Sequence, residues 1–347
     1  MATTLHLLVP GLLTVGRSVV ANPALAAPGA PALRWLLARA QARPAPATVD
    51  ATLFQLFNAS IPADADLPVA AVTRLADGGD PDDEWWLRAD PVHLRPDLYG
   101  VLLADARVLA IEPVEAALLA AAFDQTFAAE GLQLRVPRPD RWYLRLPADP
   151  GFRTHPLLDA IGRDINPLLP YGPSAPRWHA LLTEIQMLFH QHPVNRVREE
   201  RNQPLINSIW FWGGGACPTG VRAPAADLCA NDPLTRGLAR LANAAVSPVP
   251  EHAGDWLDSA SRETDSLVVL ETMRYDPAED DLTRWSDHLL ELEYHWFTFC
   301  RQWLQTGKLA TLHLYPGNGQ VYTLTGAARW RFWRRAQSLS VYVVPRT

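Results

Sequence analysis

Short apolar runs alternate with stretches of helical spacing near both ends of the chain. Residues 5–9 (LHLLV) and 266–270 (SLVVL) are short, mostly apolar runs, which is typical of strands buried on both faces of a sheet. Apolar positions recur with helical spacing over residues 30–42 and 281–305. Further strands are predicted at 206–212, 310–315 and 320–324, and further helices at 52–57 and 175–192. This alternation predicts an α/β fold in which a mostly parallel sheet has helices on both faces.

The middle of the chain follows a different pattern. An Ala- and Leu-rich helix is predicted over residues 112–130, because Pro113 suits a first helical turn and Gly131 suits the end of a helix. Strands are predicted around it at 84–94, with a turn at Asp90-Pro91, and at 106–111, 133–136 and 141–146. We therefore predict an α/β core formed by residues 1–85 and 196–347, with a smaller α+β domain inserted at 86–195.

The composition argues against several classes of function. The 347 residues have a formal net charge of -6 and no long basic block, so we expect no nucleic acid partner. No run of 18 apolar residues is present, which predicts no membrane span, and Pro10-Gly11 interrupts an N-terminal run that lacks a positive start. The three cysteines suit a reducing compartment. We expect a protein of the bacterial cytoplasm, since its Ala-, Arg- and Pro-rich composition is typical of a high-GC genome.

Several clusters have both a chemical and a structural interpretation. The glycines at 213–215 follow a predicted strand and could bring backbone amides to an anion or simply form a tight turn. The acidic run at 276–281 could bind a divalent cation or cap the following helix. His190 and His192 are two positions apart and do not share a helix face, so we interpret them as a polar helix end. The Trp- and Arg-rich segment 329–335 is predicted to be a half-buried helix or strand with arginine stems packed on rings.

The middle of the chain resembles the archaeal-type cofactor-independent phosphoglycerate mutases of the alkaline phosphatase superfamily. The segments that carry this resemblance are WWLRADPVHL, RWYLRL and HPVNRVREERNQPLINSIWFWGGG. The resemblance implies an alkaline phosphatase-like core and a ligand-binding cleft for a phosphorylated or carboxylated metabolite. The implied ligand-binding residues are Arg88, Asp90, His93, Asn195, Arg198, Asn207, Trp210, Trp212, Gly213 and Gly215.

The catalytic half of the chain departs from that family's pattern. The resemblance implies an Asp ligand after the first strand, where this chain has Pro10-Gly11, and an Asp-His pair near residue 316, where it reads Tyr315-Pro316-Gly317. Such enzymes use two metals to activate a Ser or Thr nucleophile, and Ser18 would stay unactivated without them. We therefore expect no catalytic residues, no metal ligands and no cofactor.

The whole chain is similar to the proteobacterial RpfE-type regulatory proteins, including the Leu-x-Pro-Gly start and the INSIWFWGGG strand. That similarity implies a regulatory protein that binds a small anion or a protein partner. One alternative is an active phosphotransferase with a rearranged site around Asp276, Asp280 and His313. Another is a protein-interaction regulator with no small ligand, whose contact surface is the C-terminal Trp- and Arg-rich segment.

Overall fold

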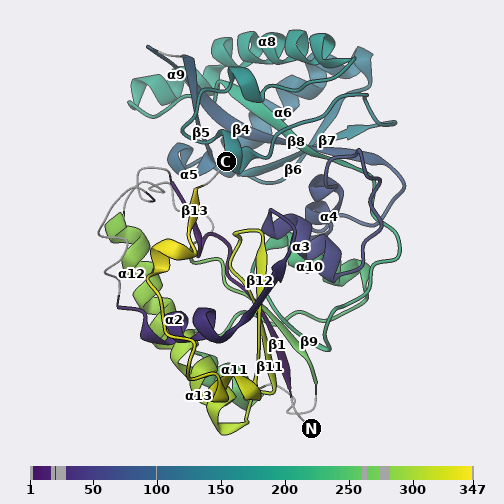
Figure 1. The fold of residues 1–347 in the computed structure, drawn as a ribbon. Helices are drawn as coiled ribbons and strands as arrows, with labels where there is room; N and C mark the ends of the chain where they lie inside the picture. The colour runs from purple at the N-terminus through teal and green to yellow at the C-terminus, as the bar shows by residue number, and fades with distance from the viewer. Residues whose placement is uncertain are drawn as a thin grey trace. The chain divides into compact units, whose positions relative to one another are not determined.

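The chain folds into two compact units in a computed structural model (Figure 1). The structure describes residues 3–16, 20, 29–98, 100–259, 264–273 and 282–345. Unit 1 comprises residues 1–59 and 221–347, and unit 2 comprises residues 60–220. Unit 2 is therefore inserted into unit 1 along the chain.

Unit 1 is built on a six-stranded sheet in the order β3-β12-β11-β1-β10-β9. Strands β11, β1, β10 and β9 run parallel, whereas β12 is antiparallel to both of its neighbours. A separate pair joins β2 and β13. The bounds are β1 Thr4–Leu8, β2 Thr14–Val15, β3 Gln41–Pro44, β9 Asp227–Cys229, β10 Ser266–Val269, β11 Thr311–Tyr315, β12 Gln320–Thr325 and β13 Val344–Pro345. The predicted mostly parallel α/β architecture is confirmed.

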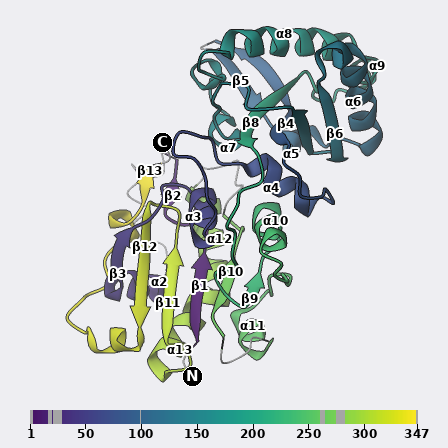
Figure 2. The same ribbon diagram turned by 90° about the vertical axis from the view of Figure 1, so that its right-hand side faces the viewer.

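Helices cover this sheet (Figures 1 and 2). One face packs its leucines against α2, α12 and α13, forming the core of unit 1, while α3 and α10 pack against each other on the other side. The helices are α2 Pro31–Arg39, α3 Val49–Leu56, α10 Pro233–Leu241, α11 Ala253–Ser259, α12 Leu282–Leu292 and α13 Thr298–Thr306, with short 3-10 turns at Gly326–Trp330 and Leu339–Val341.

The predicted helix at 281–305 contains a π-helical turn, Glu293–Phe297, between α12 and α13. This turn places the Glu293 carboxylate at the start of α2, where it accepts the backbone N–H groups of Ala32 at 2.5 Å and Leu33 at 2.9 Å. The residue before α2, Ala30, has no side chain that could serve as a cap. Glu293 therefore supplies the N-terminal cap of α2 from a distant part of the chain.

Unit 2 is a five-stranded sheet with helices. The long strand β4 pairs with β8 along one edge, and along the other with β7 through its first half and β5 through its second half, while β6 pairs with β7. The bounds are α4 Val69–Ala76, β4 Trp85–Asp97, β5 Gly100–Ala104, α5 Ala106–Leu109, α6 Pro113–Phe127, a 3-10 turn Ala128–Glu130, β6 Gln133–Arg138, β7 Arg141–Leu146, α7 Leu157–Ala160, a 3-10 turn Asn166–Leu168, α8 Ala175–Gln191, α9 Pro193–Glu200 and β8 Ser208–Gly215.

Two local predictions in unit 2 were wrong. No turn forms at Asp90-Pro91, because Pro91 lies between the β4 residues that pair with β7 (85–88) and those that pair with β5 (93–97). Its missing N–H therefore removes no ladder bond on that edge. Residues 106–111 form the short helix α5 and not a strand, and Ala110 ends it in the left-handed conformation with φ 46°.

The unit boundaries differ from the predicted domain boundaries of 85/86 and 195/196. Strand β8 pairs with β4 along most of its length, so residues 208–215 belong to unit 2 and not to the core. Helix α4 packs on β4 and β8, which moves the first boundary back to residue 59/60.

The segment 329–335 was predicted to be half-buried, and this was wrong. It is the end of a short 3-10 turn followed by a second turn, in which the Arg334 N–H donates to the Arg331 carbonyl at 3.0 Å, and Trp330, Phe332 and Trp333 are 64%, 76% and 66% exposed. Among the described residues, no helix is long and apolar enough to cross a membrane.

Candidate functional site

Apolar and polar side chains alternate along β4 and its neighbouring strands. The sheet of unit 2 therefore has one apolar face and one polar face. Leu87, Ala89 and Phe211 point to the apolar side and pack under α6 and α8. Arg88 and Asp90 point to the opposite side, where α4 covers them. The strand register places Tyr143 and Trp212 opposite Arg88 and therefore on the same polar face.

Arg88 and Asp90 form a buried ion pair. The Arg88 guanidinium donates to the Asp90 carboxylate at 2.7 and 2.8 Å through Nη2 and at 3.1 Å through Nε. Arg88 is 5% exposed and Asp90 1%. Burial alone would lower the pKa of Arg88, but Asp90 more than reverses this, so the pKa of Arg88 lies above its ordinary value. The two rings of Tyr143 and Trp212 lie 5.2 and 5.1 Å from the guanidinium.

Other protein groups take up most of the remaining hydrogen-bonding capacity of this pair. Asp90 also accepts from the Trp212 indole N–H at 2.7 Å and the Trp142 backbone N–H at 3.3 Å. Arg88 Nη1 donates to the Thr73 hydroxyl at 3.4 Å, and that hydroxyl donates to the Val69 carbonyl at 2.7 Å. A bound anion would compete with Asp90 for the guanidinium, since four of its five N–H donors already have protein acceptors.

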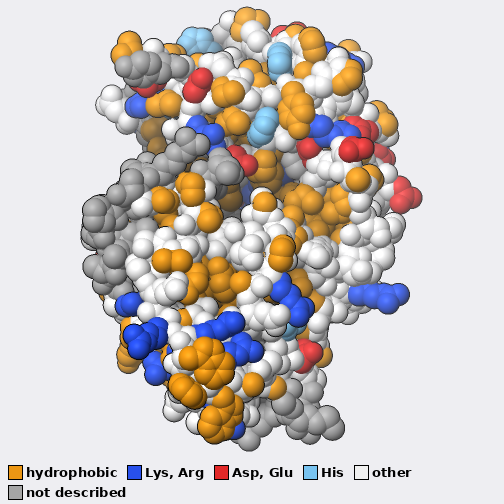
Figure 3. Space-filling view, in the orientation of Figure 1, with side chains coloured by type: hydrophobic (Ala, Val, Ile, Leu, Met, Phe, Trp, Pro, Cys, Tyr) orange, Lys and Arg blue, Asp and Glu red, His pale blue; other side chains and the backbone are white. Residues whose placement is uncertain are grey.

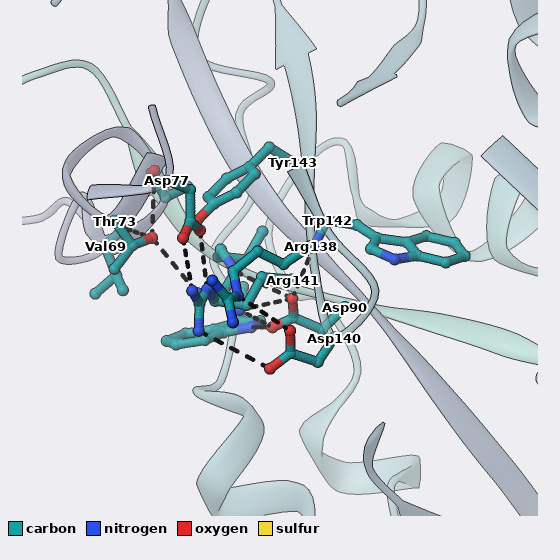
Figure 4. A network of polar contacts seen from close by, with 12 residues as sticks. Val69, Thr73, Asp77, Asp90, Arg138, Asp140, Arg141, Trp142 and Tyr143 are labelled. Carbon is teal, nitrogen blue, oxygen red and sulfur yellow. Dashed lines mark hydrogen bonds and ion pairs between the residues drawn. The ribbon is translucent and has the colours of Figure 1, made fainter. Parts of the chain in front are cut away.

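A second carboxylate, Asp77, extends the network at the end of α4 (Figure 4). It accepts two hydrogen bonds from Arg141, at 2.6 and 2.8 Å, and one from the Tyr143 hydroxyl at 2.6 Å. Burial would raise the pKa of Asp77, but these donors outweigh burial and hold its pKa below the usual range. Burial also raises the pKa of the Tyr143 phenol, which keeps it protonated as a donor.

Arg198 and Asn195 lie elsewhere, in the helical layer on the apolar side. Arg198 is fully buried and contacts Glu115 of α6 at 2.6 Å, the Pro204 carbonyl at 2.8 Å and the Leu109 carbonyl. The Asn195 side chain accepts the Ile206 N–H at 2.9 Å and donates to the carbonyls of Phe189 and Ile206. These two residues hold α9 to its surroundings, and they do not converge with Arg88 on one cleft.

The other residues implied by the resemblance also make internal contacts. Asn207 bridges to β4, accepting the Leu94 N–H at 2.7 Å and donating to the Leu94 carbonyl at 2.8 Å, so its side chain extends the pairing of β8 with β4. His93 contacts the Leu205 carbonyl through Nδ1 at 2.8 Å. The Trp210 indole donates to the His155 carbonyl at 3.0 Å.

The triple glycine continues β8 and allows close packing. A Cβ at Gly214 would lie 2.0 Å from the Trp85 ring, and one at Gly213, where φ is +64°, would lie 3.0 Å from Val69. Gly215 similarly approaches Pro68. The Gly213 N–H donates to the Thr154 hydroxyl at 3.2 Å. The glycines are therefore explained by contacts within unit 2.

In unit 1, the carboxyl ends of the parallel strands are joined by backbone hydrogen bonds. After β1 and β11, the Val9 N–H donates to the Tyr315 carbonyl at 2.9 Å and the Leu13 N–H to the Pro316 carbonyl at 3.2 Å. A Cβ at Gly11, where φ is +81°, would lie 2.4 Å from the Met273 carbonyl oxygen. The turns after β1, β10 and β11 are thus packed backbone against backbone at the edge of the sheet where α/β proteins place their ligands.

His313 does not lie at that edge. It is in the middle of β11, its Nδ1 is 2.9 Å from the Thr323 hydroxyl, and its ring stacks on His6 with centroids 4.7 Å apart. Ser18, Asp276 and Asp280 lie outside the described residues. Within the described ranges, no group of three or more His, Cys, Asp or Glu is placed to hold a metal ion. His192 ends α8, and its ring accepts the Val194 N–H at 3.3 Å, consistent with a polar helix end.

Sequence reasoning missed four residues of the polar network: Thr73, Asp77, Arg141 and Tyr143. Tyr143 and Arg141 alternate with Trp142 in a predicted strand, so a common face could have been read from that strand. Thr73 and Asp77 are four residues apart, which is the spacing of one helix face. No local signal connects these two elements with Arg88.

Comparisons with known proteins find a partial sequence similarity to a phosphoglycerate mutase and a similarity of fold to solved structures. No protein-family model matches the chain. The probable 2,3-bisphosphoglycerate-independent phosphoglycerate mutase of Geobacter sulfurreducens is 31% identical over 138 residues, which are 36% of this chain and 33% of that protein. The match thus spans about a third of the relative's length, and the similarity concerns part of each chain.

Two solved structures are similar over most of the chain. The PH0037 protein from Pyrococcus horikoshii has a TM-score of 0.54 at 14% identity, covering 98% of this chain and 91% of that one. The cofactor-independent phosphoglycerate mutase from Thermoplasma acidophilum has a TM-score of 0.48 at 17% identity, covering 94% and 90%. At 14% identity, the similarity to the Pyrococcus horikoshii protein concerns the fold alone.

Proposed function

We propose that this chain is a catalytically silent relative of the cofactor-independent phosphoglycerate mutases and acts as a regulatory protein through binding. The observation that supports this most directly is the composition of the strand ends in unit 1. The turns after β1 and β11 contain Pro10-Gly11 and Pro316-Gly317, which have no side-chain donor for a metal. Their backbones are hydrogen-bonded and packed together.

The mutase resemblance implies carboxylate and imidazole ligands at those positions for a two-metal centre. The residues present do not fit such a centre, since proline and glycine offer only backbone atoms and the backbone is already engaged. Insertion of a side chain at Gly11 would collide with the Met273 carbonyl.

The regulatory part of the proposal rests on the resemblance to RpfE-type proteins that the Leu-x-Pro-Gly start and the INSIWFWGGG strand suggest. A phosphorylated or carboxylated metabolite is the ligand that the mutase resemblance implies. Because Arg88 and Arg198 make their ionic contacts inside unit 2, the proposal does not place that ligand on them.

The test is a turnover assay with 3-phosphoglycerate and Mn²⁺, with an active phosphoglycerate mutase measured in parallel. We expect no turnover above the buffer blank and no stoichiometric Zn²⁺ or Mn²⁺ in the purified protein. Turnover that disappears in both D276N and H313Q would refute the proposal and establish the rearranged site. Turnover that both variants retain would point to a contaminating enzyme, which a further purification step would remove.

A further inference from the structure

The C-terminal part of the chain has a charge opposite to that of the rest. Residues 308–347 contain six basic and no acidic residues, which leaves 25 basic and 37 acidic residues for the rest of the chain. Four of the six are in the segment Arg329–Arg335, interleaved with Trp330, Phe332 and Trp333. We call these seven residues the Arg-aromatic segment. Figure 3 shows basic side chains gathered beside large apolar ones on one face of unit 1.

Hydrogen bonds from arginines hold this segment in place. Arg331 donates to the Arg39 carbonyl at 2.6 Å and Arg334 to the Ala40 carbonyl at 2.7 Å, both at the C-terminal end of α2. Arg329 donates to the Gln305 carbonyl at 3.3 Å, and Arg34 donates to the Gln337 carbonyl just beyond the segment at 2.8 Å. A helix C-terminus is the negative end of its dipole, so these cations are well placed there.

The three aromatic rings are held outward by the same arrangement. The rings of Phe332 and Trp333 pack edge to face with centroids 5.3 Å apart, and the Arg329 guanidinium lies 5.0 Å from the Trp330 ring. Their exposed fractions of 64–76% correspond to roughly 400 Å² of accessible aromatic surface. That is the size of the largest apolar patch on a typical monomer, and such patches are commonly binding sites.

Positive charge is also crowded beneath the segment. The guanidinium groups of Arg39 and Arg301 lie 4.8 and 5.6 Å from the ring of Trp35. Burial and the nearby Arg301 lower the pKa of Arg39. No acidic side chain of the described ranges lies within 4.0 Å of the arginines in the Arg-aromatic segment or of these two. The Glu293 carboxylate offsets part of the charge of Arg301, and an external anionic group would relieve the repulsion that remains.

We propose that the Arg-aromatic segment docks an acidic polypeptide segment of a partner protein, with apolar side chains between its carboxylates. Tryptophan and arginine are the residues that dominate protein–protein binding energy, and a rigid segment loses little entropy on binding. A short acidic peptide contacts only this basic region. An anionic bilayer is a much larger surface, so acidic side chains elsewhere on the chain would come within a Debye length of it, about 8 Å, and would be repelled. Single-stranded nucleic acid needs free ring faces, and Arg329 already occupies one face of Trp330.

This inference rests on the proposed function in one respect, that a regulatory protein needs a partner. If the peptide fails to bind, the result of the turnover assay is unaffected. The test uses fluorescence anisotropy of a labelled (Glu-Leu)6 peptide with the full chain. We expect the unaltered chain to bind the peptide. The affinity should fall at least about tenfold in the triple variant W330S/F332S/W333S and, separately, in the single variant R335E. Tyr171→Ser, at a ring in unit 2 that is 54% exposed, is the matched control and should bind like the unaltered chain.

The chemistry of the partner is tested with three further probes. We expect weak binding of (Gln-Leu)6, of vesicles of phosphatidylcholine and phosphatidylserine, and of oligo(dT). Equal binding of the Glu and Gln peptides, a preference for vesicles or oligo(dT), or full binding by the folded triple variant would each overturn the proposal. Thermal melts of both variants verify folding, and R335E alters one exposed side chain only.

Discussion

Replacing Arg88 by Met tests whether the polar network of unit 2 is structural. The substitution keeps most of the side-chain volume and removes the cation from a carboxylate that is 1% exposed. Asp90 would keep the Trp212 and Trp142 N–H donors but lose the three contacts from Arg88. Removing one partner of a buried ion pair destabilises a protein by about 3–5 kcal/mol. With a urea dependence of about 2 kcal/mol/M, the unfolding midpoint of unit 2 should fall by roughly 2 M.

The assay combines urea unfolding with hydrogen exchange read by mass spectrometry. Exchange in peptides from β4 and β7 reports on unit 2 separately, because the two units need not unfold together. D90N should be destabilised by a similar amount. The double variant R88M/D90N should lose less free energy of unfolding than the sum of the two single variants, with a coupling energy of about 2 kcal/mol. Arg145→Met is the control, since Arg145 is on the same sheet and pairs with Glu84 at the surface.

The opposite outcome would refute the structural interpretation. Binding sites commonly store strain, so that removing a site residue leaves stability unchanged or raises it. Suppose that R88M were as stable as the unaltered chain and that adding D90N caused no further loss of stability. Arg88 would then be a ligand-binding residue held in place at a cost to stability. The mutase resemblance would then gain support at this position.

Three further changes probe other parts of the structure. Arg198→Met should destabilise unit 2 by about 3–5 kcal/mol, because Glu115 would lose its buried partner, and exchange in α9 should rise. Gly214→Val should lower the melting temperature by overpacking worth about 1–3 kcal/mol, since its Cβ meets the Trp85 ring at 2.0 Å, and W85A should recover part of the loss. Burial, with the nearby His313, lowers the pKa of His6 from 6.5 to about 4, so the folded state binds fewer protons and stability falls as pH drops from about 6.5 towards 4. The loss at pH 5 should reach at most about 2 kcal/mol by linkage, and H6L should flatten the dependence of the melting temperature on pH.

Local signals explain which parts of the fold were predictable. Strands β1 and β10 are apolar runs, and helix α6 begins at Pro113 and is followed by a left-handed Gly131 with φ 72°. Each signal lies within the element that it specifies or a few residues beyond its end. Pro91 is different, because whether it breaks β4 depends on where β7 ends and β5 begins on the neighbouring edge. That information is not present near Pro91 in the sequence.

The polar network shows the same limit for the site. Arg88 and Asp90 were identified from a resemblance, but their contacts to Thr73, Trp142 and Trp212 join segments up to 122 residues apart. Sequence spacing gives no measure of such contacts, so an arginine already paired inside the protein looks the same as one available to a ligand. The Arg-aromatic segment was misjudged for a related reason, since its composition suits burial, whereas its arginines bond to carbonyls of Arg39 and Ala40 and hold the rings outward.

The surviving resemblance to the mutases therefore has a physical explanation that does not involve substrate. Arg88, Asp90, Asn195, Arg198 and Asn207 each satisfy a buried charge or a backbone group of unit 2, and losing any of them would leave an uncompensated group. The stability of the folded state is a sufficient reason for these residues, whether or not a ligand binds. Metal ligands at strand ends satisfy no such requirement, so backbone turns can replace them without loss of stability. Interior motifs that resemble those of the mutases thus say little about activity, and the strand ends and exposed surface are where function should be tested.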